Sequence, residues 1–213
     1  MTTLDPDRVL ALAYVPVSRR PAVEALWILD AALGAAIAGG SEPMITRIKL
    51  AWWREALERL DQAPPPAEPV LQALAAHVLP MGLTGLAMAE MEASWSVLLK
   101  DTALSADDLE LYADRGRLLF RYSAMLLGGT DPVLELGGAD WALADLARHS
   151  GEPDAAAALA RVSQGQNGER WPKRLRPLGM LAMLARRDAR EGPGQQGSPR
   201  RMVRMLGHRL SGW

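Results

Sequence analysis

The sequence predicts an all-α fold, a single-domain bundle of helices. Apolar residues recur at intervals of three and four along most of the chain, which is the spacing of one helical face. No segment sustains the two-residue alternation of a half-buried strand. At 213 residues the chain is long enough to bury roughly 70% of its unfolded surface in one core.

In the first half of the chain, helix-start residues precede the periodic segments. Asp5 before Pro6 marks the first start, and Ser41 followed by Pro43 marks the third, because a cap residue and then proline suit the first helical turn. The proline-rich stretch 62–69 predicts a surface loop. The helices expected here cover residues 6–14, 21–38, 43–61, 68–79 and 83–101, with ends good to about two to four residues.

The second half of the chain also contains residues that mark the starts and ends of helices. Ser105 with Asp108 three residues later is typical of a capping box, and Gly128–Gly129 and Gly151 are expected helix ends. The helices expected here cover residues 105–127, 139–149, 153–163, 173–191 and 199–210. The glycine-rich stretch EGPGQQGSP predicts a flexible linker. We therefore expect a helical domain over 1–190, and a linker with a basic C-terminal helix over 191–213.

The segment SEPMITRIKLAWWREALERL, residues 41–60, is the most informative helix. Its expected packed face contains Ile45, Ile48, Trp52, Ala56 and Leu60. Lys49 falls inside this apolar arc, where a cation needs a carboxylate, an anionic ligand or a route to water. Of the adjacent tryptophans, Trp52 is the better candidate to line a cavity, although core packing is its default role.

Composition restricts the class of protein. There are no cysteines, which excludes disulfides and thiolate metal sites and fits a cytoplasmic location. The N-terminus MTTLDPDRV is acidic where a secretory signal would be basic and then apolar. The most apolar stretch, residues 22–40, contains Glu24 and Asp30, so we expect a buried helix and not a membrane span.

Charge is divided unevenly along the chain. Residues 1–160 contain 12 Lys/Arg and 22 Asp/Glu, a balance of −10, whereas residues 161–213 contain 12 and 3, a balance of +9. Arginines interleaved with methionine and tryptophan suit an anionic membrane surface, at the inner face of a membrane, or a protein partner. Packing against the chain's own acidic part is an equally weighted alternative, and nucleic acid is not expected. The candidate surface contains Arg186, Arg187, Arg200, Arg201, Arg204 and Trp213.

Several segments resemble the squalene and phytoene synthase family. RIKLAWWREAL after SEPM is similar to the family's Arg-Leu-x-Trp-Trp-Arg helix, and RPAVEALWILD is similar to the preceding helix. YADRG from Tyr112, LLGG and WPKRLRPL resemble later segments more loosely. The resemblance implies an isoprenoid-synthase fold, here shortened toward the C-terminus. The SEPM version is most similar to the branch that includes the mitochondrial complex I assembly factor and its bacterial relatives.

The resemblance also implies a metal site that this chain departs from. The family's synthases hold Mg²⁺ with two Asp-x-x-x-Asp helices, because i and i+4 place both carboxylates on one face. Here the first motif reads Asp30-Ala-Ala-Leu-Gly34, and no second motif follows, since Asp140 and Asp145 are five residues apart. Only Asp30 remains as a metal ligand, and a pairing with Lys49 or a backbone donor is the favoured interpretation. The candidate cavity residues are Asp30, Lys49, Trp52, Tyr112 and Asp114.

Two functions follow as hypotheses. The preferred one is a synthase-like protein that has lost Mg²⁺-dependent prenyl transfer and acts as a binding or assembly factor, with complex I assembly as the specific role. The alternative is a diverged prenyl-diphosphate transferase of isoprenoid biosynthesis. No cofactor is expected under the first hypothesis, and Mg²⁺ only under the second. The expected partners are an apolar or prenyl ligand and, through the basic C-terminus, a membrane surface or a protein.

Overall fold

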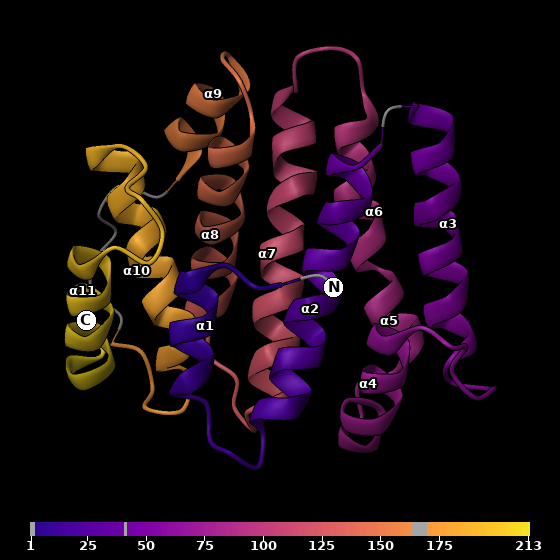
Figure 1. Ribbon diagram of the computed structural model, residues 1–213. Coiled ribbons are helices and arrows are strands. Elements are labelled where there is room, and N and C mark those ends of the chain that lie inside the picture. Colours follow the sequence, from indigo (N-terminus) through magenta and orange to yellow (C-terminus); the bar gives the residue numbers. More distant parts are fainter. Residues whose placement is uncertain (1–2, 41, 163–169) are drawn as a thin grey trace.

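The computed structural model describes residues 3–40, 42–162 and 170–213. Over these residues the chain forms α-helices and two short 3-10 helices, with no strand. The helices stand side by side, with α2 and α7 in the middle, α3 at one edge and α10 and α11 at the other (Figure 1). The all-α prediction is therefore confirmed.

The elements follow the chain in this order: α1 Pro6–Ala13, α2 Arg20–Ala38, α3 Pro43–Arg59, α4 Pro69–His77, η1 Leu79–Met81, α5 Gly85–Ala89, α6 Met91–Ser96, η2 Val97–Leu99, α7 Ala106–Leu126, α8 Val133–His149, α9 Asp154–Arg161, α10 Arg176–Glu191 and α11 Pro199–Ser211. Two of the three predicted helix caps are confirmed. Asp5 accepts hydrogen bonds from the backbone N–H groups of Asp7 and Arg8, and Ser105 and Asp108 form the capping box. Pro43 lies in the first turn of α3, whereas the predicted cap Ser41 lies outside the described residues.

Two predicted boundaries are wrong. The helix expected over 83–101 is divided into α5, α6 and η2, because α5 packs on α3 while α6 packs on α7. The Asp61 carboxylate accepts the N–H groups of Gly85 and Leu86 and so caps the start of α5. Helix α8 begins at Val133 and not at 139, since Gly137 and Gly138 are inside it. Packing against α7 outweighs the weak intrinsic helix propensity of this glycine pair.

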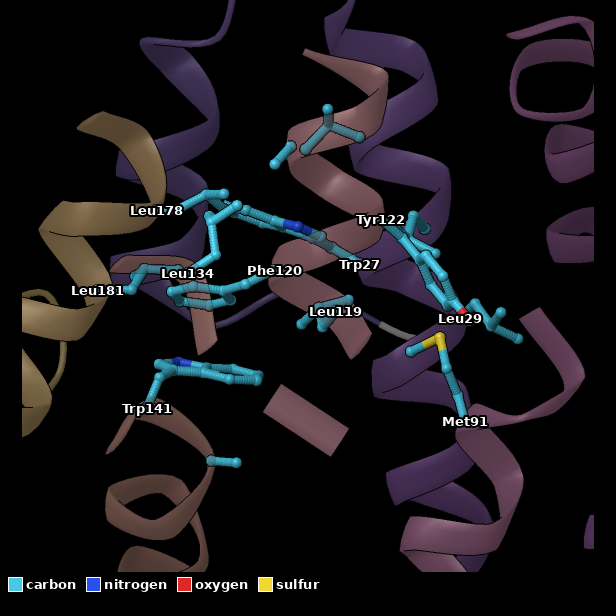
Figure 2. Close-up of a cluster of buried hydrophobic side chains, with 14 of the residues drawn as sticks. Trp27, Leu29, Met91, Leu119, Phe120, Tyr122, Leu134, Trp141, Leu178 and Leu181 are labelled. Carbon is cyan, nitrogen blue, oxygen red and sulfur yellow. The ribbon is translucent and has the colours of Figure 1, made fainter. Parts of the chain in front are cut away.

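The core is centred on α2 and α7. Helix α2 is the one helix in the described ranges that is long and apolar enough to cross a membrane, yet its Leu26, Trp27 and Leu29 are fully buried, as expected for a core helix. Trp27 Nε1 donates to Ser123 Oγ at 2.9 Å. Toward α8, the Phe120 and Trp141 rings stack (Figure 2), with their centroids 5.8 Å apart.

Helix α3 is turned relative to the prediction. Its buried positions include Leu50 and Leu57, whereas Ile45, Ile48 and Trp52 of the predicted packed face are exposed. Ala56 and Leu60 of that face are buried. Helix α3 stands at the edge of the bundle, and α2, α5 and α6 pack against its inner side. Only one of its two neighbouring rows of apolar residues can therefore face the core. The prediction that Ile45, Ile48 and Trp52 pack inward is wrong.

Candidate functional site

Asp30 lies in the middle of α2 and is completely buried. Arg115 of α7 binds it with two nitrogens: Nε lies 2.7 Å from Oδ1 and Nη2 lies 2.8 Å from Oδ2. This fork-to-carboxylate geometry gives two parallel charge-assisted hydrogen bonds. Since Arg115 is itself 1% exposed, the pair is an internal ion pair at the centre of the bundle.

Two further side chains donate to the same carboxylate. Arg8 Nη1, from α1, lies 2.9 Å from Oδ2, and Trp95 Nε1, from α6, lies 3.2 Å from Oδ1. Asp30 therefore accepts four hydrogen bonds from three helices, and two of its partners are cations. A buried carboxylate with this many donors is held firmly in one orientation.

A second carboxylate balances the two arginines. Arg115 Nη1 donates to Asp145 of α8 at 2.7 Å and to the Tyr112 hydroxyl at 2.6 Å. The buried arginines Arg115 and Arg8 are thus paired with Asp30 and Asp145, and Asp5 adds a third, partly exposed carboxylate at Arg8 Nε. Internal charges that are paired and hydrogen-bonded in this way escape most of the cost of burial.

Aromatic rings enclose the cations. The guanidinium of Arg115 lies 4.0 Å from the centroid of the Trp95 ring and 4.7 Å from that of Trp141. The guanidinium of Arg8 lies 5.5 Å from the Trp141 ring centroid. These are cation–π distances, so the rings both exclude water and add attraction to the buried charges.

Gly34 shows what occupies the place of the missing aspartate. A Cβ atom built on Gly34 would lie 2.6 Å from Cη2 of Trp95, well inside contact distance. The position one turn after Asp30, where the synthase motif has its second carboxylate, therefore faces the indole ring of Trp95. The glycine is required by this ring and leaves no room for an acidic side chain.

The ionisation of the network follows from its charges. Burial disfavours the charge of Arg115, but Asp30, Tyr112 and Asp145 outweigh it and raise the pKa of Arg115 well above its usual range. Burial likewise opposes the ionisation of Asp145, yet the charges of Arg115 and Arg8 hold the pKa of that carboxyl below its usual value. Burial also raises the pKa of the Tyr112 hydroxyl. These three shifts move the pKa values of Arg115, Asp145 and Tyr112 away from neutral pH, so none of the three side chains is suited to exchange a proton there.

The structure brings together only part of the predicted cavity. Asp30 and Tyr112 meet through Arg115. The predicted pairing of Asp30 with Lys49 is wrong, because Lys49 is exposed on the edge helix α3 while Arg115 and Arg8 occupy the carboxylate.

Trp52 and Asp114 also lie outside the internal site. Trp52 is 45% exposed on α3 and lines a surface groove of about 330 Å³ together with Pro64 and Pro66. Asp114 pairs with Arg117 at 2.6 Å on the outer side of α7, which is the charge-balanced face that a solvated helix presents.

Sequence reasoning missed the residues that complete the site: Arg8, Trp95, Arg115, Trp141 and Asp145. One usable signal was present, since Arg115 follows Tyr112 by three residues and so shares its helical face. Asp140 and Asp145 do point to different partners, Arg186 and Arg115 respectively, as their five-residue spacing predicts. In the part of the chain that the structure describes, no three His, Asp or Glu side chains are grouped to hold a metal ion.

The basic C-terminal residues divide into two groups. Arg201 is buried between Asp7 and Asp188, and Arg186 binds Asp140, so these two satisfy the chain's own carboxylates. Arg187, Arg200 and Arg204 all lie within 4 Å of the single carboxylate of Glu191, and Trp213 is exposed.

The comparison with known families agrees with this architecture. The sequence profile of squalene/phytoene synthases matches residues 1–163, well over half of the chain. The chain belongs to this family. No curated protein and no solved structure matches it. The matched region of this squalene/phytoene synthase family member contains the whole network from Arg8 to Asp145, whereas α10 and α11 lie beyond it.

Mg²⁺, which the family implies, does not fit the residues of this site. Magnesium requires several oxygen ligands, held in octahedral geometry. Here the Asp30 carboxylate is shared by two guanidinium groups, the second family position is Gly34, and Asp145 is bound to Arg115. A dication in this place would lie against two fixed cations.

Proposed function

We propose that this squalene/phytoene synthase family member has lost Mg²⁺-dependent prenyl transfer and acts as a binding or assembly protein. One observation carries the proposal: the guanidinium of Arg115 is bound through two nitrogens to the one remaining aspartate of the metal motif. Departure of diphosphate needs concentrated positive charge that can reach the leaving group. The positive charge of Arg115 is instead neutralised inside the bundle.

The donors of Arg115 support this interpretation. Its Nε and Nη2 donate to Asp30, and its Nη1 donates to Tyr112 and Asp145. A diphosphate would have to displace these partners and the Trp95 ring that covers them. The internal network therefore replaces a substrate site with a structural one, and a prenyl or other apolar ligand would bind elsewhere on the protein.

The proposed function requires no cofactor. The specific role that we propose is assembly of respiratory complex I, on the basis of the SEPM-type helix start and the incomplete metal motif. This role is tested by deleting the gene in the organism that encodes it and measuring the amount of assembled complex I. A normal amount of complex I in the deletion strain would contradict the assembly role, but it would not bear on the proposed loss of catalysis.

Calorimetric titration tests whether the Mg²⁺-dependent substrate site has been lost. The purified protein is titrated with a non-hydrolysable farnesyl diphosphate analogue, with and without Mg²⁺, beside an active family synthase as the positive control. We expect no Mg²⁺-dependent heat, because the Asp30 carboxylate has no site left for the ion. Tight binding that requires Mg²⁺ would contradict the proposal and support the alternative, a diverged prenyl-diphosphate transferase.

A further inference from the structure

Helix α11 presents an apolar line to solvent. Its exposed apolar side chains after Met202 are Val203, Leu206 and Leu210, three and four residues apart, and Leu210 is 80% exposed. Such spacing forms one continuous strip along a helix. The outer face of α11 consists of Met202, Val203, Leu206 and Leu210 of the helix, together with the exposed Trp213 that follows its Gly212 cap.

The opposite side of α11 is fixed to the bundle. Arg201 Nε and Nη1 donate to Asp7 and Asp188, at 2.9 and 2.6 Å, and Met205 is completely buried. At the end of the helix, the guanidinium of Arg176 donates to the carbonyl groups of Arg209, Leu210 and Ser211. The helix cannot turn its apolar strip inward without breaking these contacts.

Cations lie close to this strip, in a cluster at Glu191 and at the C-terminal end of the helix. Arg187, Arg200 and Arg204 share the carboxylate of Glu191, so three positive charges meet one negative charge and the group retains a charge of +2. Arg170 lies beside the end of the helix, with Nε donating to the carbonyl of Ser211. Within residues 170–213 the described acids are Asp188, which is buried, and Glu191. The surroundings of the outer face are thus strongly positive.

The length and position of α11 would allow the helix to lie along a flat surface. Thirteen residues at 1.5 Å each make α11 about 20 Å long, too short to cross a bilayer but enough to lie along one. The helix stands at the edge of the bundle (Figure 1), and among the described helices α10 and α1 are those that pack closely against it. An apolar strip flanked by arginines, with a tryptophan at one end, is the arrangement of helices that lie in the interface of anionic membranes.

We propose that the outer face of α11 docks the protein on an anionic lipid bilayer. The apolar side chains enter the boundary between headgroups and acyl chains, and the surrounding arginines attract the lipid phosphates. This surface lies outside the closed internal network, so the inference holds whether or not any transferase activity remains.

Vesicle binding by the full chain tests the inference. We expect the protein to cosediment with vesicles of mixed phosphatidylcholine and phosphatidylglycerol at least about tenfold more tightly than with phosphatidylcholine alone, and less tightly as salt is raised. Val203→Glu/Leu210→Glu, which places two carboxylates on the outer face, should weaken this binding by at least about tenfold. Both positions are exposed, so the fold should remain intact, as circular dichroism can verify.

A matched control is available on the other edge of the molecule. Met44→Glu/Ile48→Glu makes the same change on the exposed apolar side of α3, where Met44 and Ile48 are 66% and 62% exposed. This variant should bind vesicles like the unaltered protein. The proposal is overturned if folded protein binds neither vesicle type, which would favour a protein partner, or binds neutral vesicles equally well. Loss of binding in the α3 variant, with the α11 variant unaffected, would also overturn it.

Discussion

Asp30 illustrates how one side chain changes its role when its neighbours change. A lone carboxylate of a metal motif, buried without an ion, would be destabilising by several kcal/mol. Arg115 and Arg8 supply the missing positive charge as permanent side chains, and Trp95 supplies the fourth hydrogen bond. The remaining aspartate thus has a structural reason to persist without a bound metal.

Replacing Asp30 by asparagine should expose this role. Asp30→Asn keeps the shape but removes the carboxylate that Arg115 and Arg8 share, which leaves Arg115 paired with Asp145 and Arg8 paired with Asp5. We expect the free energy of unfolding to fall by about 3–5 kcal/mol, the usual cost of breaking a buried ion pair.

Urea denaturation measures this loss, and Asp114→Asn is the matched control. Asp114 is paired with Arg117 at a partly exposed site, so the control should change the free energy of unfolding by no more than about 1 kcal/mol. If both variants lost the same free energy of unfolding, the internal ion pair would contribute no more to stability than the partly exposed one.

At the scale of elements, the crossing of α7 and α8 brings Arg115 and Asp145 into contact. Gly116 and Gly138 face each other there, and a Cβ atom on Gly116 would lie 1.9 Å from the carbonyl oxygen of Gly138. The two backbones touch because neither residue has a side chain. Helix α8 pairs more extensively with α7 than with any other element, so this close approach fixes the position of the whole site.

Adding one methyl group at the crossing should therefore be costly. Gly116→Ala forces the helices apart, and we expect it to lower the free energy of unfolding by about 3 kcal/mol or more, at or above the upper end of typical overpacking costs. Gly207→Ala in α11 is the control, because a Cβ atom there meets nothing within 4 Å. That control should stabilise the protein by about 0.5–1 kcal/mol. Chemical denaturation of both variants tests whether the crossing distinguishes them.

At the scale of the whole molecule, ion pairs connect the C-terminal helix with the N-terminal helix. Arg201 of α11 binds Asp7 of α1 and Asp188 of α10, so the basic C-terminal part meets the acidic N-terminal part. The uneven charge distribution along the sequence is thus partly neutralised within the fold. Part of the remaining positive charge lies beside α11, where three arginines share Glu191.

Arg201→Met tests this connection. It keeps most of the apolar stem but removes the cation between two buried carboxylates, and we expect the free energy of unfolding to fall by about 3 kcal/mol. Arg200→Met, one residue earlier and exposed, should change it by no more than about 1 kcal/mol. Thermal or urea unfolding provides the comparison, and similar values for the two would mean that α11 is not held by this ion pair.

Local features of the sequence determined most of the fold. Helix periodicity, the caps at Asp5 and Ser105 and the helix end at Gly128 depend on neighbours within a few residues, so they can be predicted without a structure. The incomplete metal motif at Asp30 and Gly34 and the basic C-terminal part are likewise visible in the sequence.

Tertiary packing alone decided which residues meet. Arg115 lies 85 positions after Asp30, and nothing local distinguishes it from Lys49 as the partner. The side of α3 that turns inward and the start of α8 at Val133 were also set by neighbouring helices. Spacing along one helix defines the faces of that helix, but pairing between helices depends on how well whole surfaces fit. The sequence therefore determined the helices and the incomplete metal motif. Only the tertiary structure decided that the Trp95 ring lies against Gly34 and that an arginine pairs with Asp30.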